Sequence, residues 1–129
     1  MRLLLDTHVF LWLNDDPRRV GDHLDLLHDP ATERLLSAAS VWELAIKVGL
    51  GKLQIPEPVD TWVPSRVRAT ATSPIAVEHD HAVRVASLPD HHRDPFDRLL
   101  IAQAQALGVP ILTADRAFGR YDVEVLSIG

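Results

Sequence analysis

The residues of this sequence that are suited to joint chemistry are acidic and lie far apart in the chain. The four candidates are Asp6, Glu43, Asp97 and Asp115. Two carboxylates about 5 Å apart repel by roughly 3 kcal/mol at an effective dielectric constant of 20, which raises a pKa by about two units unless a cation lies between them. Ligand sets made of oxygen alone favour Mg²⁺ or Mn²⁺ over zinc. Such an ion activates water and stabilises charge in phosphodiester hydrolysis.

Asp6 and Asp115 occupy comparable positions in the chain. Each follows a short apolar run and has a threonine nearby, Thr7 in the first case and Thr113 in the second. Aspartate is also a common N-cap of a following helix, and for either residue alone both interpretations stay open. Two such residues at one edge of a sheet favour a shared site.

The stretch HHRDPFDRLLIAQA, residues 91–104, contains two more acids at the start of an apolar helix. Asp94 precedes Pro95, the arrangement of an N-cap with proline at the first helical position, so we favour a capping role for it. Asp97 shares its helix face with Leu100, Ile101 and Ala104. Because that face must pack on the sheet, we expect Asp97 to point inward, into a site.

Glu43 has two interpretations that the sequence leaves open. It precedes Lys47 by four residues, which is typical of a surface ion pair worth a few tenths of a kcal/mol. Its other helical neighbours are Ala39, Ser40, Ile46 and Leu50, and this is not a solvated face.

Strand and helix patterns alternate along the chain. Short apolar or β-branched runs predict strands at 3–5, 33–37, 73–77, 109–113 and 123–128. Helical patterns cover 9–13, a mixed segment to about 28, 38–50, 59–69, 78–87 and 95–108. This order predicts an α/β fold with a mainly parallel sheet flanked by helices, in which ligands bind beyond the carboxyl ends of the strands.

Composition limits the class of protein. With 129 residues, 47% hydrophobic and 24% charged, we expect a single domain over residues 1–129. The absence of cysteine excludes disulfides, thiolate metal sites and a cysteine nucleophile. The amino-terminal MRLLLDTH does not read as a signal peptide and no apolar run has membrane-spanning length, so we expect a cytoplasmic protein with no membrane partner. The net charge of −5 argues against broad electrostatic binding of nucleic acid, but leaves room for a cation-filled acidic pocket.

Four motifs, in this order and at these separations, resemble PIN-domain ribonucleases, and more narrowly the VapC-type toxins of type II toxin–antitoxin systems. They are LLDTH at 4–8, SVWE at 40–43, HRDPFDRLLIA at 92–102 and LTAD at 112–115. The resemblance runs from residue 1 to about residue 128. It implies a Rossmann-like PIN fold, endoribonuclease activity dependent on Mg²⁺ (or Mn²⁺), an RNA substrate, inhibition by a cognate antitoxin and a homodimer.

The resemblance also assigns roles to individual residues. Asp6, Glu43, Asp97 and Asp115 match the acidic set, with Asp6 and Asp97 as direct metal ligands. Glu43 or Asp115 would position or deprotonate the attacking water. Position 115 is often asparagine in such proteins. Thr7 and Thr113 would orient carboxylates or waters. Asp94 matches a position to which we assign no catalytic part.

Other residue types have less specific patterns. Arg93, Arg98 and Arg116 lie beside the acids and are candidates for phosphate contacts, although ordinary surface pairs are favoured. The seven histidines lack the spacing of a zinc motif, so surface or packing roles are favoured for them. Trp12, Trp42 and Trp62 are expected in the core or at an interface. If the chain dimerises or binds an antitoxin helix, the candidate contact residues are Phe10, Trp12 and Trp42.

Three other functions are compatible with an acidic α/β domain. A signalling receiver would have paired acids after the first strand and a lysine after a late strand, but Asp6 stands alone and no lysine follows Thr113. A haloacid-dehalogenase-type phosphatase would need an aspartate where His8 stands. A non-catalytic binding domain that keeps an acidic Mg²⁺ pocket is the third, and the complete set of acids argues against it.

Overall fold

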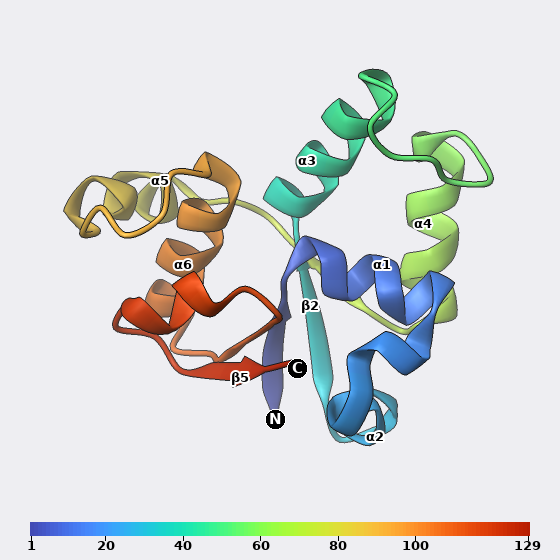
Figure 1. The fold of residues 1–129 in the computed structure, drawn as a ribbon, viewed down its shortest axis with the longest axis horizontal. Coiled ribbons are helices and arrows are strands. Elements are labelled where there is room, and N and C mark those ends of the chain that lie inside the picture. The colour runs from blue at the N-terminus through green and yellow to red at the C-terminus, as the bar shows by residue number, and fades with distance from the viewer.

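The computed structural model describes residues 1–129, and its centre is a five-stranded parallel sheet (Figure 1). The strands run in the order β3-β2-β1-β4-β5. Their bounds are β1 Arg2–Leu5, β2 Glu33–Ser37, β3 Ser73–Ile75, β4 Ile111–Thr113 and β5 Val125–Ser127. Every neighbouring pair is parallel, as the alternation of strand and helix patterns predicts.

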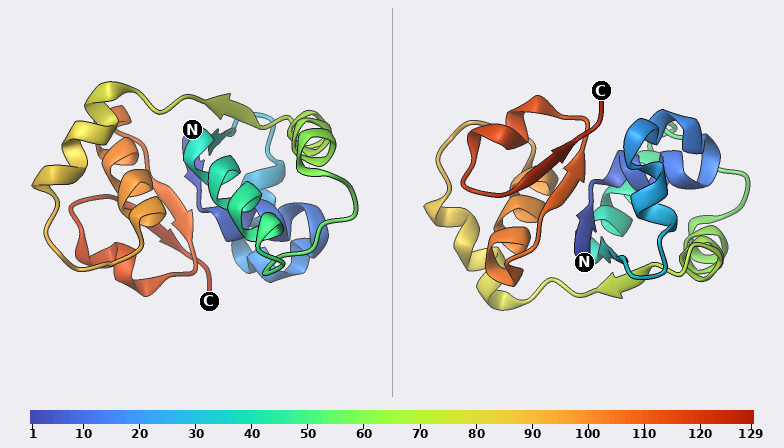
Figure 2. Two further views of the ribbon diagram at one scale, coloured as in Figure 1. Left: turned by 90° about the horizontal axis from the view of Figure 1, so that it is seen from above. Right: turned by 90° about the horizontal axis from the view of Figure 1, so that it is seen from below.

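Helices connect the strands and cover both faces of the sheet (Figure 2). The α-helices are α1 Thr7–Asp15, α2 Leu24–His28, α3 Ala38–Gly49, α4 Val59–Ala69, α5 His79–Arg84 and α6 Pro95–Leu107. Short 3₁₀ helices are η1 Pro17–His23, η2 Val85–Ser87 and η3 Arg116–Arg120. None of these helices is long and apolar enough to cross a bilayer.

The central strand β1 is buried on both faces, and its side chains divide the interior into two cores. Leu3 and Leu5 belong to a core with Phe10 and Trp62, beneath α1 and α4. Leu4, between them, belongs to a second core, to which α6 contributes four of the twelve buried residues. A strand sends successive side chains to opposite faces, which is why an unbroken Leu3–Leu5 run fits here.

The order of the strands changes direction at one point of the sheet. Moving outward from β1, the chain reaches β2 and β3 on one side and β4 and β5 on the other, so the order reverses between β1 and β4. In such sheets ligands bind outside the carboxyl ends of the strands at this switch point. The observed order is the Rossmann order 3-2-1-4-5-6 without its sixth strand, whereas flavodoxin-like proteins and signalling receivers have the order 2-1-3-4-5.

Three segments differ from the sequence prediction. The single helix expected over 78–87 is α5 followed by the 3₁₀ turn η2. The mixed helix expected up to about residue 28 is divided into η1 and α2, because Gly21 adopts φ 67°, ψ −133°, a conformation favoured by glycine. The 3₁₀ turn η3 after β4 was not predicted, since five residues carry too short a periodic signal. The helix over 95–108 is confirmed, and Gly108 ends it with a left-handed φ of 66°.

Candidate active site

A cavity of about 310 Å³ opens at the carboxyl ends of the strands, and all four candidate acids line it. The lining residues are Asp6, His8, Trp12, Glu43, Lys47, Asp94, Asp97, Ala114 and Asp115. They come from the ends of β1 and β4 and from α1, α3 and α6. Parallel strands and the helices that follow them meet at this edge, so residues separated by up to 109 positions share one cavity.

Asp6 follows β1 directly and is 5% exposed. It stands at the N-cap position of α1, but its side chain makes no capping hydrogen bond. The Thr113 hydroxyl donates to Asp6 Oδ2 over 2.7 Å. Burial raises the pKa of Asp6, although this hydrogen bond and the positive charge of His8 oppose the increase. The capping interpretation is therefore wrong for Asp6, whose carboxylate faces the cavity.

Glu43 is buried on α3, at 2% exposed. The Thr7 hydroxyl donates to Glu43 Oε1 at 2.7 Å, and Lys47 Nζ lies 2.6 Å from Oε2. The predicted pair with Lys47 exists, but it is not an ordinary surface pair because the carboxylate is inside. The hydrogen bond to Glu43 raises the pKa of Lys47, so its ammonium group stays charged at neutral pH.

Asp97 points inward from the first turn of α6, as its helix face predicts, and its side chain is 14% exposed. Burial, followed by the negative charges of Asp6, Asp94, Glu43 and Asp115, raises its pKa to about 8. Asp94 performs the predicted cap, since its Oδ1 accepts hydrogen bonds from the N–H groups of Phe96 (2.9 Å) and Asp97 (3.4 Å). One motif therefore supplies both a helix cap and a site carboxylate.

Asp115 caps a helix, which was one of its two interpretations, and it also lines the cavity. Its Oδ1 accepts from the N–H of Ala117 over 2.9 Å, which caps η3. Its Oδ2 lies 2.8 Å from His92 Nε2. Burial works to raise its pKa, but the hydrogen bonds from Ala117 and His92, with the positive charge of Arg120, lower it overall. Asp115 is therefore an ionised ligand candidate at neutral pH.

His92 is the site residue that sequence reasoning missed. Its Nε2 lies 3.0 Å from Asp97 Oδ2 and 2.8 Å from Asp115 Oδ2. His92, Asp97 and Asp115 form the group whose potential ligand atoms all lie within 4.8 Å of one another. Asp6 and Glu43 line the same cavity but fall outside this tighter group. The position of His92 just before the Asp94–Asp97 motif was the available signal.

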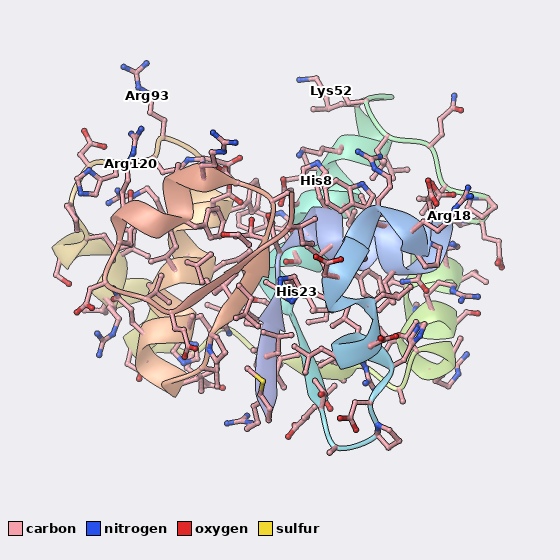
Figure 3. All side chains as sticks on the ribbon, turned by 60° about the horizontal axis from the view of Figure 1, so that its bottom comes forward. His8, Arg18, His23, Lys52, Arg93 and Arg120 are labelled. Carbon is pink, nitrogen blue, oxygen red and sulfur yellow. The ribbon has the colours of Figure 1, made fainter.

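The three candidate arginines have different surroundings. Arg98 is committed to the fold, because its guanidinium donates to the carbonyl oxygens of Pro89, Val85 and Leu88. It is therefore neither a surface pair nor free to contact phosphate. Arg93 and Arg116 are exposed and form no ion pair. Arg93 projects away from the body of the protein (Figure 3).

The aromatic candidates also separate. Phe10 is fully buried and Trp62 is 5% exposed, so Phe10 is wrong as a partner-contact residue. Trp12 is half-buried at the cavity, where the Arg19 guanidinium lies 4.3 Å from its ring centre. Trp42 is 60% exposed, Ile46, one turn further along α3, is 38% exposed, and Leu50, which directly follows α3, is 63% exposed. These three residues form an exposed apolar stripe along α3 and its C-terminal end.

The donor set of the cavity fits a hard divalent cation. Five carboxylates line it, including that of Asp94, and the charges of the other four contribute to the raised pKa of Asp97. A cation among them would remove this repulsion, and carboxylate oxygens are the ligands that Mg²⁺ and Mn²⁺ prefer. Asp97 and Asp115, whose oxygens belong to the tighter group, and Asp6, whose charge acts on Asp97 from the same cavity, are the candidate ligands.

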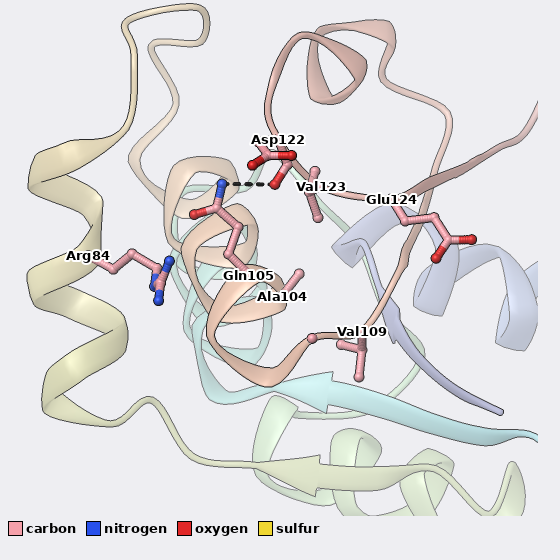
Figure 4. Close-up of a pocket in the computed structure, with 8 residues that line it drawn as sticks. Arg84, Ala104, Gln105, Val109, Asp122, Val123 and Glu124 are labelled. Atoms are coloured by element: carbon pink, nitrogen blue, oxygen red, sulfur yellow. Dashed lines mark hydrogen bonds between the residues drawn. The ribbon is translucent and has the colours of Figure 1, made fainter.

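A second polar cavity, of about 350 Å³, lies at the opposite end of β4 (Figure 4). Gln105 crosses it to donate to the carbonyl oxygen of Asp122 over 3.1 Å. Its charged residues Arg84, Asp122 and Glu124 are all exposed. It lacks the buried, converging acids of the first cavity and lies at the end of the sheet where ligands are not expected.

Comparison with known proteins gives consistent matches. Residues 3–124 match the PIN domain family. The chain is 45% identical over 69 residues to Ribonuclease VapC16 of Mycobacterium tuberculosis, a match covering 50% of this chain and about half, 49%, of that protein. It is 30% identical over 115 residues to Ribonuclease VapC22 of the same organism, covering 88% of this chain and 87% of that protein. The fold resembles a chain of the Rickettsia felis VapBC2 complex, bound to a DNA fragment from its promoter, with a TM-score of 0.76, 17% identity and full coverage of both chains.

Proposed function

The chain belongs to the PIN-domain family, and on that premise we propose that it is a divalent-metal-dependent endoribonuclease, the toxin of a toxin–antitoxin pair. The observation that carries the proposal is the meeting of Asp6, Glu43, Asp97 and Asp115 in one cavity at the switch point of the sheet. The names of the two relatives, both ribonucleases, support the same reaction class. The receiver-like alternative is not favoured, because the strand order differs from that of receivers.

In this proposal the carboxylates of Asp6, Asp97 and Asp115 hold Mg²⁺ or Mn²⁺. When bound, the ion supplies a Lewis acid that activates water and stabilises negative charge on the phosphate. Thr113 holds Asp6, and His92 lies between Asp97 and Asp115, so the ligands are positioned before the ion arrives. Preorganised ligands reduce the conformational entropy lost when the ion binds.

The chain also supplies a cation of its own beside the acids. Lys47 lines the cavity and is held at Glu43 by a contact of 2.6 Å. We assign to its ammonium group a contact with a substrate phosphate next to the scissile bond. Glu43 would then hold Lys47 in place, with Thr7 fixing its other oxygen.

Both expected partners, a cognate antitoxin and a second copy of the chain, are part of the proposal. The stripe formed by Trp42, Ile46 and Leu50 supports a protein partner, because contiguous exposed apolar side chains are typical of interaction sites.

The experiment that tests the function combines growth and cleavage. We expect expression of the chain to arrest growth, and co-expression of the neighbouring gene to relieve the arrest. Purified chain with Mn²⁺ should cleave RNA, and Asp6→Asn or Asp97→Asn should abolish cleavage while the circular dichroism spectrum stays unchanged. Asp122→Asn is the matched control, because Asp122 is an exposed acid of the second cavity. Equal cleavage by wild type and both site variants would refute the proposal.

A further inference from the structure

His92 poses a specific question about the site, because its spacing to two carboxylates is compatible with two opposite roles. With Asp97 and Asp115 it makes a group of the size that holds a metal ion. An imidazole nitrogen in that group would be a ligand typical of zinc, copper or nickel. Alternatively, the ring donates a hydrogen bond to the carboxylates and leaves the ion to oxygen ligands.

The other nitrogen of the ring decides between these roles. The backbone N–H of Asp94 donates to His92 Nδ1 over 3.1 Å. A backbone N–H can only donate, so Nδ1 carries the lone pair and the single hydrogen of the neutral ring lies on Nε2. Nε2 is the atom that lies between Asp97 and Asp115. It therefore presents a hydrogen, not a lone pair, to the site.

In metal-binding histidines the donor and acceptor roles of the two ring nitrogens are reversed. They donate the hydrogen of the second ring nitrogen to a carbonyl, a carboxylate or water, which leaves the first nitrogen free for the metal. At His92 the second nitrogen accepts. The ring is also held in place, because it is 15% exposed and packs edge-on against Phe118 with ring centres 5.9 Å apart. Arg93, the next residue, points away from the body of the protein (Figure 3).

We infer that His92 is a positioning residue, whose Nε2–H holds Asp97 and Asp115 together as oxygen ligands and excludes the imidazole from the metal. This inference rests on the proposed function and adds the reason for its metal preference. An all-oxygen donor set selects Mg²⁺ or Mn²⁺, whereas an accepting His92 would select zinc or nickel. Asp94 then has two roles: its backbone N–H fixes the His92 ring, and its side chain caps α6.

Nuclear magnetic resonance of the full chain tests the tautomer directly. With ¹⁵N-labelled histidine, the long-range ¹H–¹⁵N spectrum should show His92 as the Nε2–H form, both before and after addition of Mg²⁺. A His92 ring protonated on Nδ1, or one that loses its Nε2 hydrogen when the ion is added, would overturn the inference. This measurement does not depend on RNA cleavage.

Calorimetric titration with Mn²⁺ and Zn²⁺ tests the positioning role. His92→Ala should weaken Mn²⁺ binding by about 10-fold or more, in the range found for residues that orient metal ligands. His92→Gln should recover most of that loss, because its side-chain NH₂ can donate to the same carboxylates. His91→Gln is the matched control: His91 is exposed and its ring packs on Tyr121.

The possible results separate the inference from the proposed function. Equal Mn²⁺ affinity in wild type, His92→Ala and His92→Gln would overturn the inference while the nuclease assignment stood. If Zn²⁺ binds more tightly than Mn²⁺ and this Zn²⁺ binding is lost in His92→Gln, then His92 is itself a metal ligand. That result would also overturn the inference while the nuclease assignment stood. A wild-type chain that binds no divalent cation would refute the proposed function, and the inference with it.

Discussion

The Thr113 hydroxyl joins the two acids that end β1 and β4. It donates to Asp6 Oδ2 over 2.7 Å and accepts the backbone N–H of Asp115 over 3.0 Å. Thr113 and Asp6 are 107 residues apart in sequence. The contact follows from the pairing of β1 with β4, in which Leu5 lies beside Leu112. The spacing of the candidate ligands is thus set by the same register that forms the centre of the sheet.

Replacing Thr113 should therefore damage the site and the fold together. Thr113→Val removes the donor to Asp6 and the acceptor for Asp115, and we expect a loss of about 1–3 kcal/mol in the free energy of unfolding. Urea denaturation measures this loss, and metal titration should show weaker binding. Thr113→Ser keeps the hydroxyl and should stay close to wild type. A valine variant with wild-type stability and metal affinity would contradict the role of the contact.

The stability of the metal-free protein should fall as pH rises from about 4 to about 8. The pKa of Asp97 is raised to about 8 in the folded protein, whereas the unfolded chain has an ordinary value near 4. Between these values the folded state holds a proton that the unfolded state has lost, so raising the pH favours unfolding, by a few kcal/mol in total. The raised pKa of Asp6 acts in the same direction. The lowered pKa of Asp115 stabilises the folded protein, and this contribution is lost only when the pH falls below about 4.

Urea unfolding at several pH values, in chelator, measures this dependence. Asp97→Asn removes the group whose pKa is about 8, so its stability should change much less across the same range. Wild-type stability that rises from pH 5 to pH 8 would contradict the raised pKa.

Binding of a divalent metal ion should restore the stability that the metal-free protein loses at neutral pH. Binding to the folded state alone adds RT ln(1 + [L]/Kd) to stability, about 2.7 kcal/mol at a concentration 100 times Kd. Mn²⁺ should therefore raise the Tm of the wild type at pH 7.5. Asp97→Asn should start from a higher metal-free Tm than the wild type and respond little to Mn²⁺, because it has lost both the repulsion and a ligand. Asp122→Asn should respond as the wild type does; a flat wild-type titration at millimolar metal would count against the site.

Arg34, which lies away from the site, is expected to contribute to the stability of the fold. Its side chain lies in the interior, and its guanidinium donates to four backbone carbonyls, those of Leu27, Thr32, Thr70 and Ala71. Arg34→Met leaves these carbonyls without their donor, so we expect a loss of about 2–4 kcal/mol in the free energy of unfolding. Arg68→Met, at an exposed position of α4, is the control. Chemical denaturation of both variants compares them, and equal stability would show that water replaces the guanidinium.

The sequence by itself determined the elements and the identity of the acids. Apolar runs such as Leu3–Leu5 and the Asp94–Pro95 helix start depend on neighbours close in the chain, so local patterns predict them. The acids after β1 and β4 could be placed at one sheet edge because parallel strands share a carboxyl end. The inward direction of Asp97 followed from its helix face.

Only the tertiary structure decided what each polar group meets. Glu43 was undecided because its partner Thr7 comes from another helix, 36 residues away. Asp115 and His92 are 23 residues apart, and no spacing rule joins them. The sequence left Arg98 as a surface ion pair or a phosphate contact, but its guanidinium donates hydrogen bonds to carbonyl oxygens of the segment before α6. Burial and charge at a site depend on atoms brought together by packing between elements, and packing is a property of the folded chain rather than of any one segment.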